Sequence, residues 1–366
     1  MTYVFGSLIS IAGFAQTGLF GHPDWYIKPV YSEGFILVHR VSIGHLVKGY
    51  PTSYELNIVK PSVGDHLWQL ENNLPEMGLS LQLIDFANPQ QLGYAVTAAP
   101  FIEIPLNVKV KASRPVLRVC WGLTYITKSF DIWENHKNTA IGSHYNAFVQ
   151  FRFAWHLKLT ENLRFEPGIT FSHASNGKAK NPNLGLNIVS LSAGLNFRIP
   201  GKKPVKTVTS IDSSTRARSK NELVAIGSVG INQRSINTEM LTSYVLSLTY
   251  QRNVRNTHKF SFGTDIFYDQ IYQQDYAEKN EKEPEGIDKY RVSLRAGYSY
   301  NVGRISFPIE IGVYAFQKIN PDAMLVSRLG ARYYHKSGLV VSFGLRTHFA
   351  VAYDFEYGLG YRMYLK

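Results

Sequence analysis

The chain has 366 residues, of which 45% are hydrophobic, 13% are aromatic and 18% are charged. A membrane-spanning helix needs a run of about 18 apolar residues, and Gly, Ser, Asn, Arg or Lys interrupts every apolar segment of this sequence. Two classes therefore remain, a soluble all-β protein and a transmembrane β-barrel. The net charge of +12 favours an anionic partner such as nucleic acid, membrane phosphate or a phosphorylated glycolipid. The single cysteine, Cys120, excludes an intrachain disulfide.

The first residues form a short apolar run that ends in small side chains at Gly13-Phe14-Ala15, as secretory signals do before their cleavage site. No basic segment precedes the run. We expect residues 1–16 to be a signal peptide with a shortened start, and the alternative is a short buried strand or helix.

Alternation of apolar and polar residues with a period of two is the strongest regularity, and it is clearest over residues 145–157, 290–300, 339–349 and 353–365. Segments of about ten or more residues with this pattern suit lipid-spanning strands, and lipid forces such a sheet to close because open edges find no partner there. The polar faces carry many arginines, which indicates a polar lumen containing water and acids such as Glu166 and Glu356. These arginines are Arg118, Arg152, Arg291, Arg295, Arg328, Arg332, Arg346 and Arg362.

The alternation and the turn signals predict about eight strands in each half of the chain. The predicted strands lie near 34–46, 52–60, 77–85, 97–110, 115–126, 145–157, 163–173, 187–198, 221–233, 242–254, 258–273, 288–300, 304–316, 324–335, 339–350 and 352–365. Short turns tend to alternate with longer polar loops, as they do in outer-membrane barrels, and this order places the 174–186 loop on the outer side. A polar, basic linker at 200–222 separates a half at 30–199 from a half at 223–366. The expected fold is an all-β transmembrane antiparallel barrel, either one barrel of about 14–16 strands or an eight-stranded unit plus a second barrel-like half.

A possible site of ester hydrolysis lies at the end of the 163–173 strand. By parity His173 and Ser175 share the lipid-facing side of their strand, and a hairpin centred near Lys180 places His173 opposite Asn187. A histidine can take the proton of a serine nucleophile, a third group can orient the imidazole, and an amide can stabilise the oxyanion. Those roles would fall to His173, Ser175, Asn187 and Asn176. The alternative is a polar strand end followed by an ordinary Asn-Gly turn.

The longer pattern, His-x-Ser-Asn-Gly followed by a basic spacer and Pro-Asn-x-Gly, resembles the lipid A 3-O-deacylase family (PagL, acyloxyacyl hydrolase-like). The resemblance is specific from Phe171 to Asn187 and looser over roughly 30–200. It implies an eight-stranded barrel in the outer membrane of a Gram-negative bacterium, with lipid A of lipopolysaccharide in the outer leaflet as substrate. The family's His and Ser correspond to His173 and Ser175, and its oxyanion Asn to Asn176. Asn187 stands where the family has an acid.

The resemblance therefore implies a carboxylic ester hydrolase that removes the 3-O-acyl chain without a metal or cofactor. Lys178 and Lys180 either contact substrate phosphates or only keep their loop soluble. His39 and His45, placed on one predicted strand, lack the neighbours of a metal site, and no nucleic-acid motif occurs. Two rival functions remain, a non-enzymatic channel or structural barrel and an esterase for another lipid. The oligomeric state stays open.

Overall fold

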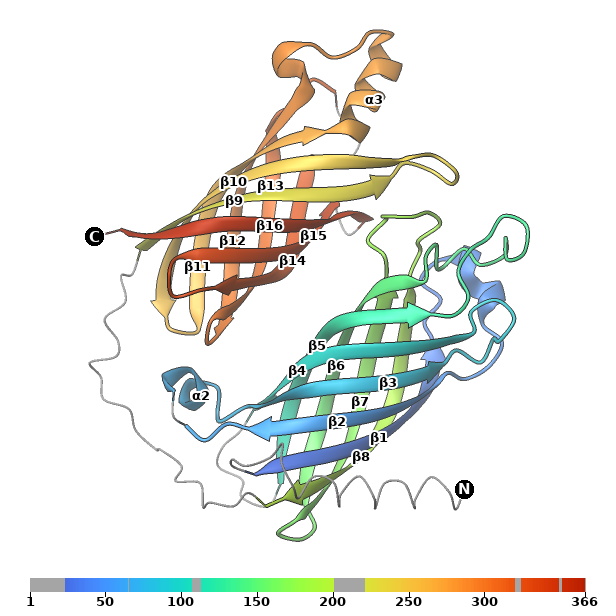
Figure 1. Cartoon of the computed structure of the whole chain (residues 1–366), viewed down its shortest axis with the longest axis vertical. Helices are drawn as coiled ribbons and strands as arrows, with labels where there is room; N and C mark the ends of the chain where they lie inside the picture. Colours follow the sequence, from blue (N-terminus) through green and yellow to red (C-terminus); the bar gives the residue numbers. More distant parts are fainter. Residues whose placement is uncertain are drawn as a thin grey trace.

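The computed structural model describes residues 24–64, 66–106, 113–200, 221–319, 324–348 and 351–365. It contains two closed barrels of eight antiparallel strands, in which each strand pairs with its neighbours in sequence (Figure 1). The fold is thus the eight-stranded unit plus a second barrel, the second of the two expected architectures, and the described strands do not form a single barrel of about 14–16 strands. The predicted signal at 1–16 and most of the predicted linker, 201–220, lie outside the described residues.

The first barrel closes by pairing β1 with β8 and the second by pairing β9 with β16. The strands of the first barrel are β1 (Trp25–Ile36), β2 (Thr52–Pro61), β3 (Glu76–Asp85), β4 (Tyr94–Pro105), β5 (Ser113–Ile126), β6 (Tyr145–Lys158), β7 (Leu163–Ser175) and β8 (Leu186–Ile199). Those of the second are β9 (Asn221–Gln233), β10 (Met240–Arg255), β11 (His258–Asp269), β12 (Tyr290–Val302), β13 (Ile305–Phe316), β14 (Leu325–Tyr334), β15 (Leu339–His348) and β16 (Val351–Leu365).

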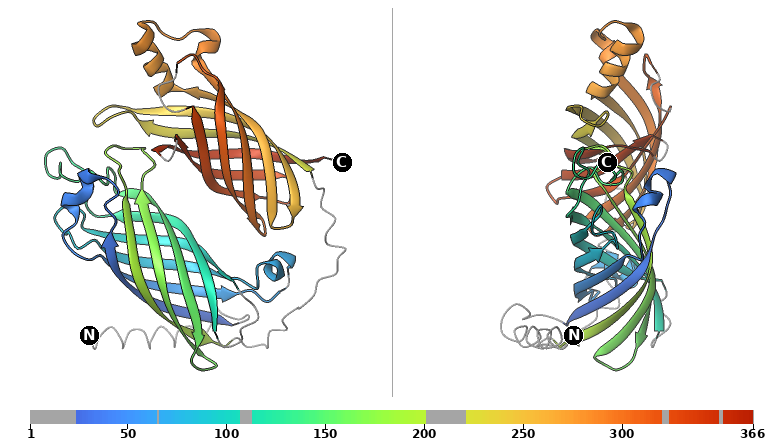
Figure 2. Two further views of the ribbon diagram at one scale, coloured as in Figure 1. Left: turned by 180° about the vertical axis from the view of Figure 1, so that it is seen from behind. Right: turned by 90° about the vertical axis from the view of Figure 1, so that its right-hand side faces the viewer.

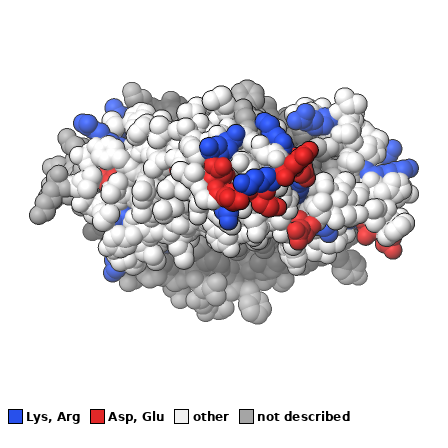
Figure 3. All heavy atoms as spheres, turned by 90° about the horizontal axis from the view of Figure 1, so that it is seen from above, with Lys and Arg blue, Asp and Glu red and all other residues white. Residues whose placement is uncertain are grey.

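Short helices occupy the connections: η1 (Val41–Leu46), α2 (Leu67–Glu71), α3 (Gln270–Asn280) and η3 (Gly286–Lys289). None of the helices in the described ranges is long and apolar enough to cross a membrane. Figure 3, which views the molecule from the α3 side, shows acidic and basic side chains gathered together while most of the surrounding surface is uncharged.

The first strand is the largest error of the sequence-based assignment. The alternation predicts a strand at 34–46, whereas β1 begins at Trp25 and the residues from Val41 to Leu46 form η1. Lys28 points into the lumen of the first barrel, where its ammonium group donates to Glu103 (2.5 Å) and Glu166 (2.8 Å). A strand with a buried lysine, a proline and a glycine lacks the usual composition of strands, so its sequence gives little signal.

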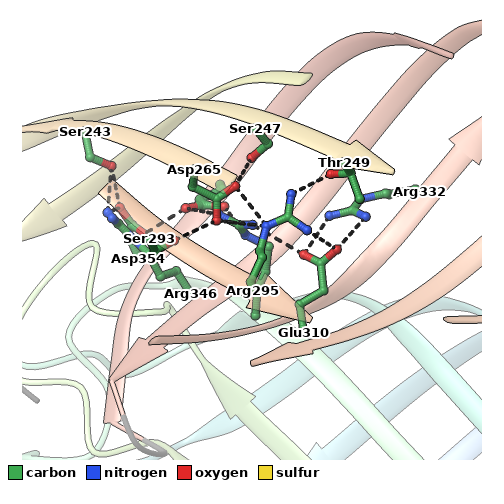
Figure 4. Close-up of polar contacts among 12 residues, drawn as sticks. Ser243, Ser247, Thr249, Asp265, Ser293, Arg295, Glu310, Arg332, Arg346 and Asp354 are labelled. Carbon is green, nitrogen blue, oxygen red and sulfur yellow. Dashed lines mark hydrogen bonds and ion pairs between the residues drawn. The ribbon is translucent and has the colours of Figure 1, made fainter. Parts of the chain in front are cut away.

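Charged side chains fill the interior of both barrels, since an eight-stranded barrel is just wide enough for side chains to pack it. In the second barrel five buried arginines pair with five buried carboxylates at N–O distances between 2.5 and 3.4 Å. These residues are Arg291, Arg295, Arg328, Arg332 and Arg346 with Asp265, Asp269, Glu310, Asp354 and Glu356. Figure 4 shows the part of this network around Arg295, Arg332 and Arg346. The inward-facing arginines are thereby confirmed, and neighbouring strands supply most of the groups that compensate their charge.

The first barrel has an apolar cluster at the end where β7 meets β8, here called the site end. The cluster contains Ile43 and Leu46 of η1 and Phe86 of the loop after β3, all of which are buried. They pack together with Ala174 and Leu186. The backbone at the end of β7 is therefore supported from inside the barrel by close-packed side chains. Such packing holds the outward-facing residues of the same strand in place.

The two barrels lie side by side with corresponding ends together, as the views in Figures 1 and 2 agree. At the site end the backbone of Asn181 donates to the side chain of Gln233 (2.6 Å). At the opposite end Asn256 of the second barrel donates to Glu71 of the first (2.9 Å). Contacts at both ends fix the relative orientation of the barrels.

Candidate functional site

The hairpin formed by β7 and β8 positions the residues of the candidate site. Its register pairs His173 directly with Asn187, as the hairpin centred near Lys180 predicts. Ser172 and Ala174 are buried toward the lumen, whereas Ile169 and Leu191 are exposed on the outer wall. His173 and Asn187 share the parity of this outer wall.

An unbroken chain of hydrogen bonds joins three of the predicted residues. Nε2 of His173 lies 2.9 Å from Oγ of Ser175, and Nδ1 of His173 lies 2.6 Å from Oδ1 of Asn187. Ser175 is only 6% exposed, so its hydroxyl is largely shielded from bulk solvent. The first distance is typical of a nucleophilic serine beside its general base, and the second is typical of a general base that a third residue orients.

His39, from the loop after β1, extends this chain by one residue. Its Nδ1 lies 3.0 Å from Nδ2 of Asn187, and its Nε2 lies 3.0 Å from the carbonyl oxygen of Leu184. A carbonyl can only accept, so Nε2 of His39 carries the proton and Nδ1 accepts from the amide of Asn187. The longer contact of Nδ1 with the Leu37 carbonyl, 3.3 Å, would need a proton on Nδ1 and is therefore the weaker interaction.

The orientation of Asn187 determines the tautomer of His173. Because Nδ2 of Asn187 donates to His39, its Oδ1 faces His173 and accepts from Nδ1–H. Nε2 of His173 then has a free lone pair directed at the hydroxyl of Ser175. The sequence pattern draws attention to His39 only as a possible metal ligand, and its contact with Asn187 carries no signal in the sequence.

Asn176 lies next to Ser175 but uses its amide to hold loops together. Its Nδ2 donates to Oγ of Ser143 (2.9 Å) and to the carbonyl of Lys180 (2.8 Å), and its backbone N–H donates to Asn183 (3.0 Å). Both amide hydrogens therefore already have acceptors. The asparagine fixes the turn that follows the serine.

Gly185, the glycine of the Pro-Asn-x-Gly pattern, also belongs to this site. Its φ of +75° is one that side chains disfavour. A Cβ atom at this position would lie 2.8 Å from Cε1 of His173 and 3.3 Å from Cβ of Ser175. Only glycine allows the chain to pass this close to the histidine ring.

The two lysines of the loop face the second barrel. The ammonium group of Lys178 lies 5.7 Å from the ring centroid of Tyr353, and its carbonyl accepts from the backbone N–H of Gln233 (3.0 Å). Lys180 lines a groove between the barrels. The loop therefore connects the candidate site to the second barrel.

One group of side chains with metal-ligand spacing occurs among the described residues, and it lies away from this site. It consists of Glu76, Glu103 and His156 in the lumen of the first barrel. Both oxygens of Glu76 accept hydrogen bonds from Arg164, at 2.7 and 2.8 Å, so they are engaged by a guanidinium group.

The sequence of each barrel matches a family model. Residues 52–196 match the lipid A 3-O-deacylase (PagL), and residues 221–365 match the acyloxyacyl hydrolase C-terminal domain. The two matches together cover most of the chain. The chain belongs to the PagL family. This membership supports a bacterial outer-membrane β-barrel with hydrolase activity as a lipid A deacylase, whose substrate is lipid A or lipopolysaccharide in the membrane.

Similar solved structures include porins of Rhodopseudomonas blastica. One double mutant is 12% identical with a TM-score of 0.17, and one triple mutant is 8% identical with a TM-score of 0.18. Both matches cover 93% of this chain and 99% of the porin. No curated protein matches the chain.

Proposed function

We propose that this PagL family member hydrolyses the ester bond of the 3-O-acyl chain of lipid A in the outer leaflet of a Gram-negative outer membrane. Ser175 is the nucleophile, His173 is the general base and Asn187 orients the imidazole. The observation that carries the proposal is the chain of hydrogen bonds from Ser175 through His173 to Asn187 on the outer wall of the first barrel.

The reaction proceeds in two steps. Oγ of Ser175 attacks the ester carbonyl while Nε2 of His173 takes the hydroxyl proton. The tetrahedral intermediate then expels the 3-hydroxyl of lipid A, which leaves with the proton from His173. Water, deprotonated by the same nitrogen, attacks the acyl-serine, and His173 returns the proton to Oγ of Ser175 as the fatty acid is released. Neither step requires a metal or a cofactor.

Asn176 is the proposed donor to the oxyanion of the tetrahedral intermediate. Its side-chain amide currently donates to Ser143 and Lys180, so one of these bonds must be exchanged for the oxyanion. The Ser143 hydroxyl is the more easily exchanged acceptor, because a hydroxyl can rotate to another partner whereas the Lys180 carbonyl is part of the turn. A charged acceptor forms the stronger hydrogen bond and favours this exchange.

The location of the site fits an insoluble substrate. An ester of lipid A lies near the boundary between its headgroup and its acyl chains, and the candidate residues lie where the apolar outer wall of the first barrel ends in polar loops. Lys180, in the loop that follows Ser175, would supply a positive charge that attracts the phosphates of lipid A. In this arrangement residues 30–199 form the catalytic domain and residues 223–366 a second domain.

The proposal is tested by mass analysis of lipid A from a Gram-negative host that lacks its own deacylase. Wild type should remove one 3-hydroxyacyl chain, and fragmentation should locate the loss at the 3-position. Ser175→Ala and His173→Ala should leave lipid A intact. Ser337→Ala and His335→Ala, which change the same residue types in an exposed turn, should behave as wild type.

Two results would argue against the proposal. Unchanged lipid A after verified outer-membrane expression of wild type would refute deacylation. Cleavage of phospholipid esters by purified wild type, with lipid A left intact, would instead indicate an esterase for another lipid.

A further inference from the structure

An open groove of about 660 Å³ separates the two barrels at the site end. Trp121, Leu123 and Ala147 line it from the first barrel. Ile231, Phe343 and Phe355 line it from the second barrel. The volume is within the range of pockets that hold small molecules.

The groove runs beside the candidate nucleophile. Ala147, on its wall, is the direct strand partner of Ser175 in the β6–β7 register, and Asn176, also on its wall, is the next residue along the chain. Leu123 continues the same row of paired residues on β5. An acyl group bound to Ser175 therefore has a short path into the groove.

The two ends of the groove differ in polarity. Ser143 and Lys180 lie at the end formed by the loops, whereas the strands contribute apolar and aromatic side chains. At the deeper end, two residues along β5 from Leu123, the rings of Trp121 and Phe343 meet with centroids 4.7 Å apart. A cationic rim above an apolar channel complements a molecule with an anionic headgroup and an acyl chain.

We propose that this groove holds the acyl chain that is cleaved, and that the second barrel thereby selects its length. The inference rests on the proposed function, since it assumes that Ser175 attacks an acyl ester. The acyl chain leaves the lipid bilayer to enter the groove. Because the bilayer is as apolar as the groove, burial of the acyl chain contributes little free energy of binding. Selectivity must then come from shape, and the Trp121–Phe343 contact limits how far a chain can reach.

The test compares chain-length profiles on a series of lipid A molecules with 3-O-acyl chains of increasing length. Phe343→Ala removes part of the floor and should shift the preference toward longer chains, by about tenfold in the ratio of rates. Phe262→Ala is the matched control, because Phe262 is an exposed outward residue of β11, a strand that does not line the groove. It should retain the wild-type profile.

A second pair of variants changes the groove in the opposite direction. Ile231→Trp narrows it and should shift the preference toward shorter chains. Ile266→Trp makes the same change on the outer wall of β11 and should have no effect. If Phe343→Ala and Ile231→Trp both keep the wild-type profile while wild type is active, the inference is wrong and the proposed function stands.

A binding measurement addresses the groove without turnover. A fatty acid brominated at its terminal carbon is titrated into the Ser175→Ala protein in detergent. The same titration of a Ser175→Ala, Trp121→Phe double variant is subtracted, which leaves the fluorescence of Trp121. Saturable quenching of Trp121 is expected. The absence of saturable quenching would overturn the inference, whether or not wild type deacylates lipid A.

Discussion

His39 and Asn187, which are separated by 148 residues, share a hydrogen bond of 3.0 Å beside the candidate nucleophile. This bond gives Asn187 a fixed orientation, in which its oxygen faces His173. In Ser-His-Asp sites a carboxylate sets the tautomer of the histidine and also stabilises the imidazolium by its charge. His39 and Asn187 together provide the first of these effects, while the second is missing.

Replacing Asn187 with Asp should therefore raise kcat for deacylation, on the order of tenfold, since the tautomer is already correct and only the charge is added. Asn187→Leu should lower kcat by about a hundredfold or more because the imidazole loses its only orienting partner on that side. Both effects can be measured as initial rates on purified lipid A in mixed micelles. A rate for Asn187→Leu equal to that of wild type would show that the amide does not orient His173.

His39→Leu should lower kcat by about tenfold, because Asn187 is then free to turn its amide nitrogen toward His173. The loss should disappear in the Asn187→Asp background, since a carboxylate has no wrong orientation, and a double-mutant cycle measures this coupling. His39→Asn, whose side chain keeps an acceptor near the position of Nδ1, should restore part of the rate. His45→Leu is the matched control from the same loop, where its Nε2 contacts the carbonyl of Lys137 (2.7 Å). Equal losses for His39→Leu and His45→Leu would indicate a general loop effect.

Parity along the chain was sufficient to predict the pair of His173 and Asn187. A period of two decides which side chains share a face, and the centre of a hairpin decides which residues are opposite. Both are local properties that a sequence displays. The number of strands in each half follows from the same alternation.

The position of His39 could not be obtained in this way. It depends on the loop after β1, whose fold follows from the insertion of Ile43 and Leu46 into the mouth of the barrel. Alternation also does not encode which strand edges pair to close a barrel, so it cannot predict that β1 pairs with β8 and β9 with β16. Phe343 shows the same limit, since an outward aromatic residue looks identical in sequence whether it faces lipid or Trp121 of the other barrel.

Removing one charge from the ion-pair network of the second barrel should destabilise that barrel. Arg295 donates to Asp265 (2.9 Å) and to Glu310 (2.8 Å), and all three side chains are buried. Arg295→Met leaves the network with one excess carboxylate, which should cost about 3–5 kcal/mol in the free energy of unfolding. The measurement is urea unfolding in detergent followed by circular dichroism.

The control for this experiment is the exposed ion pair of Lys282 with Glu285 (3.3 Å). Lys282→Ala should leave the unfolding midpoint unchanged, because solvent screens exposed pairs. A midpoint for Arg295→Met within error of wild type would mean that water or a rearranged Arg328 compensates the carboxylates.

Gly185→Ala should abolish most of the activity without unfolding the barrel. The new Cβ would lie 2.8 Å from Cε1 of His173 and must displace the ring, and a displacement of about 1 Å from the reactive geometry can cost on the order of a hundredfold in rate. Gly286→Ala is the matched control, since Gly286 also has a positive φ, +53°, but has no atom within 4 Å of the position of a Cβ. Both variants incur a similar backbone penalty, so their unfolding midpoints should be alike while only Gly185→Ala loses deacylation. If Gly185→Ala retains the wild-type rate, the arrangement of His173 and Ser175 is not the one that performs the reaction.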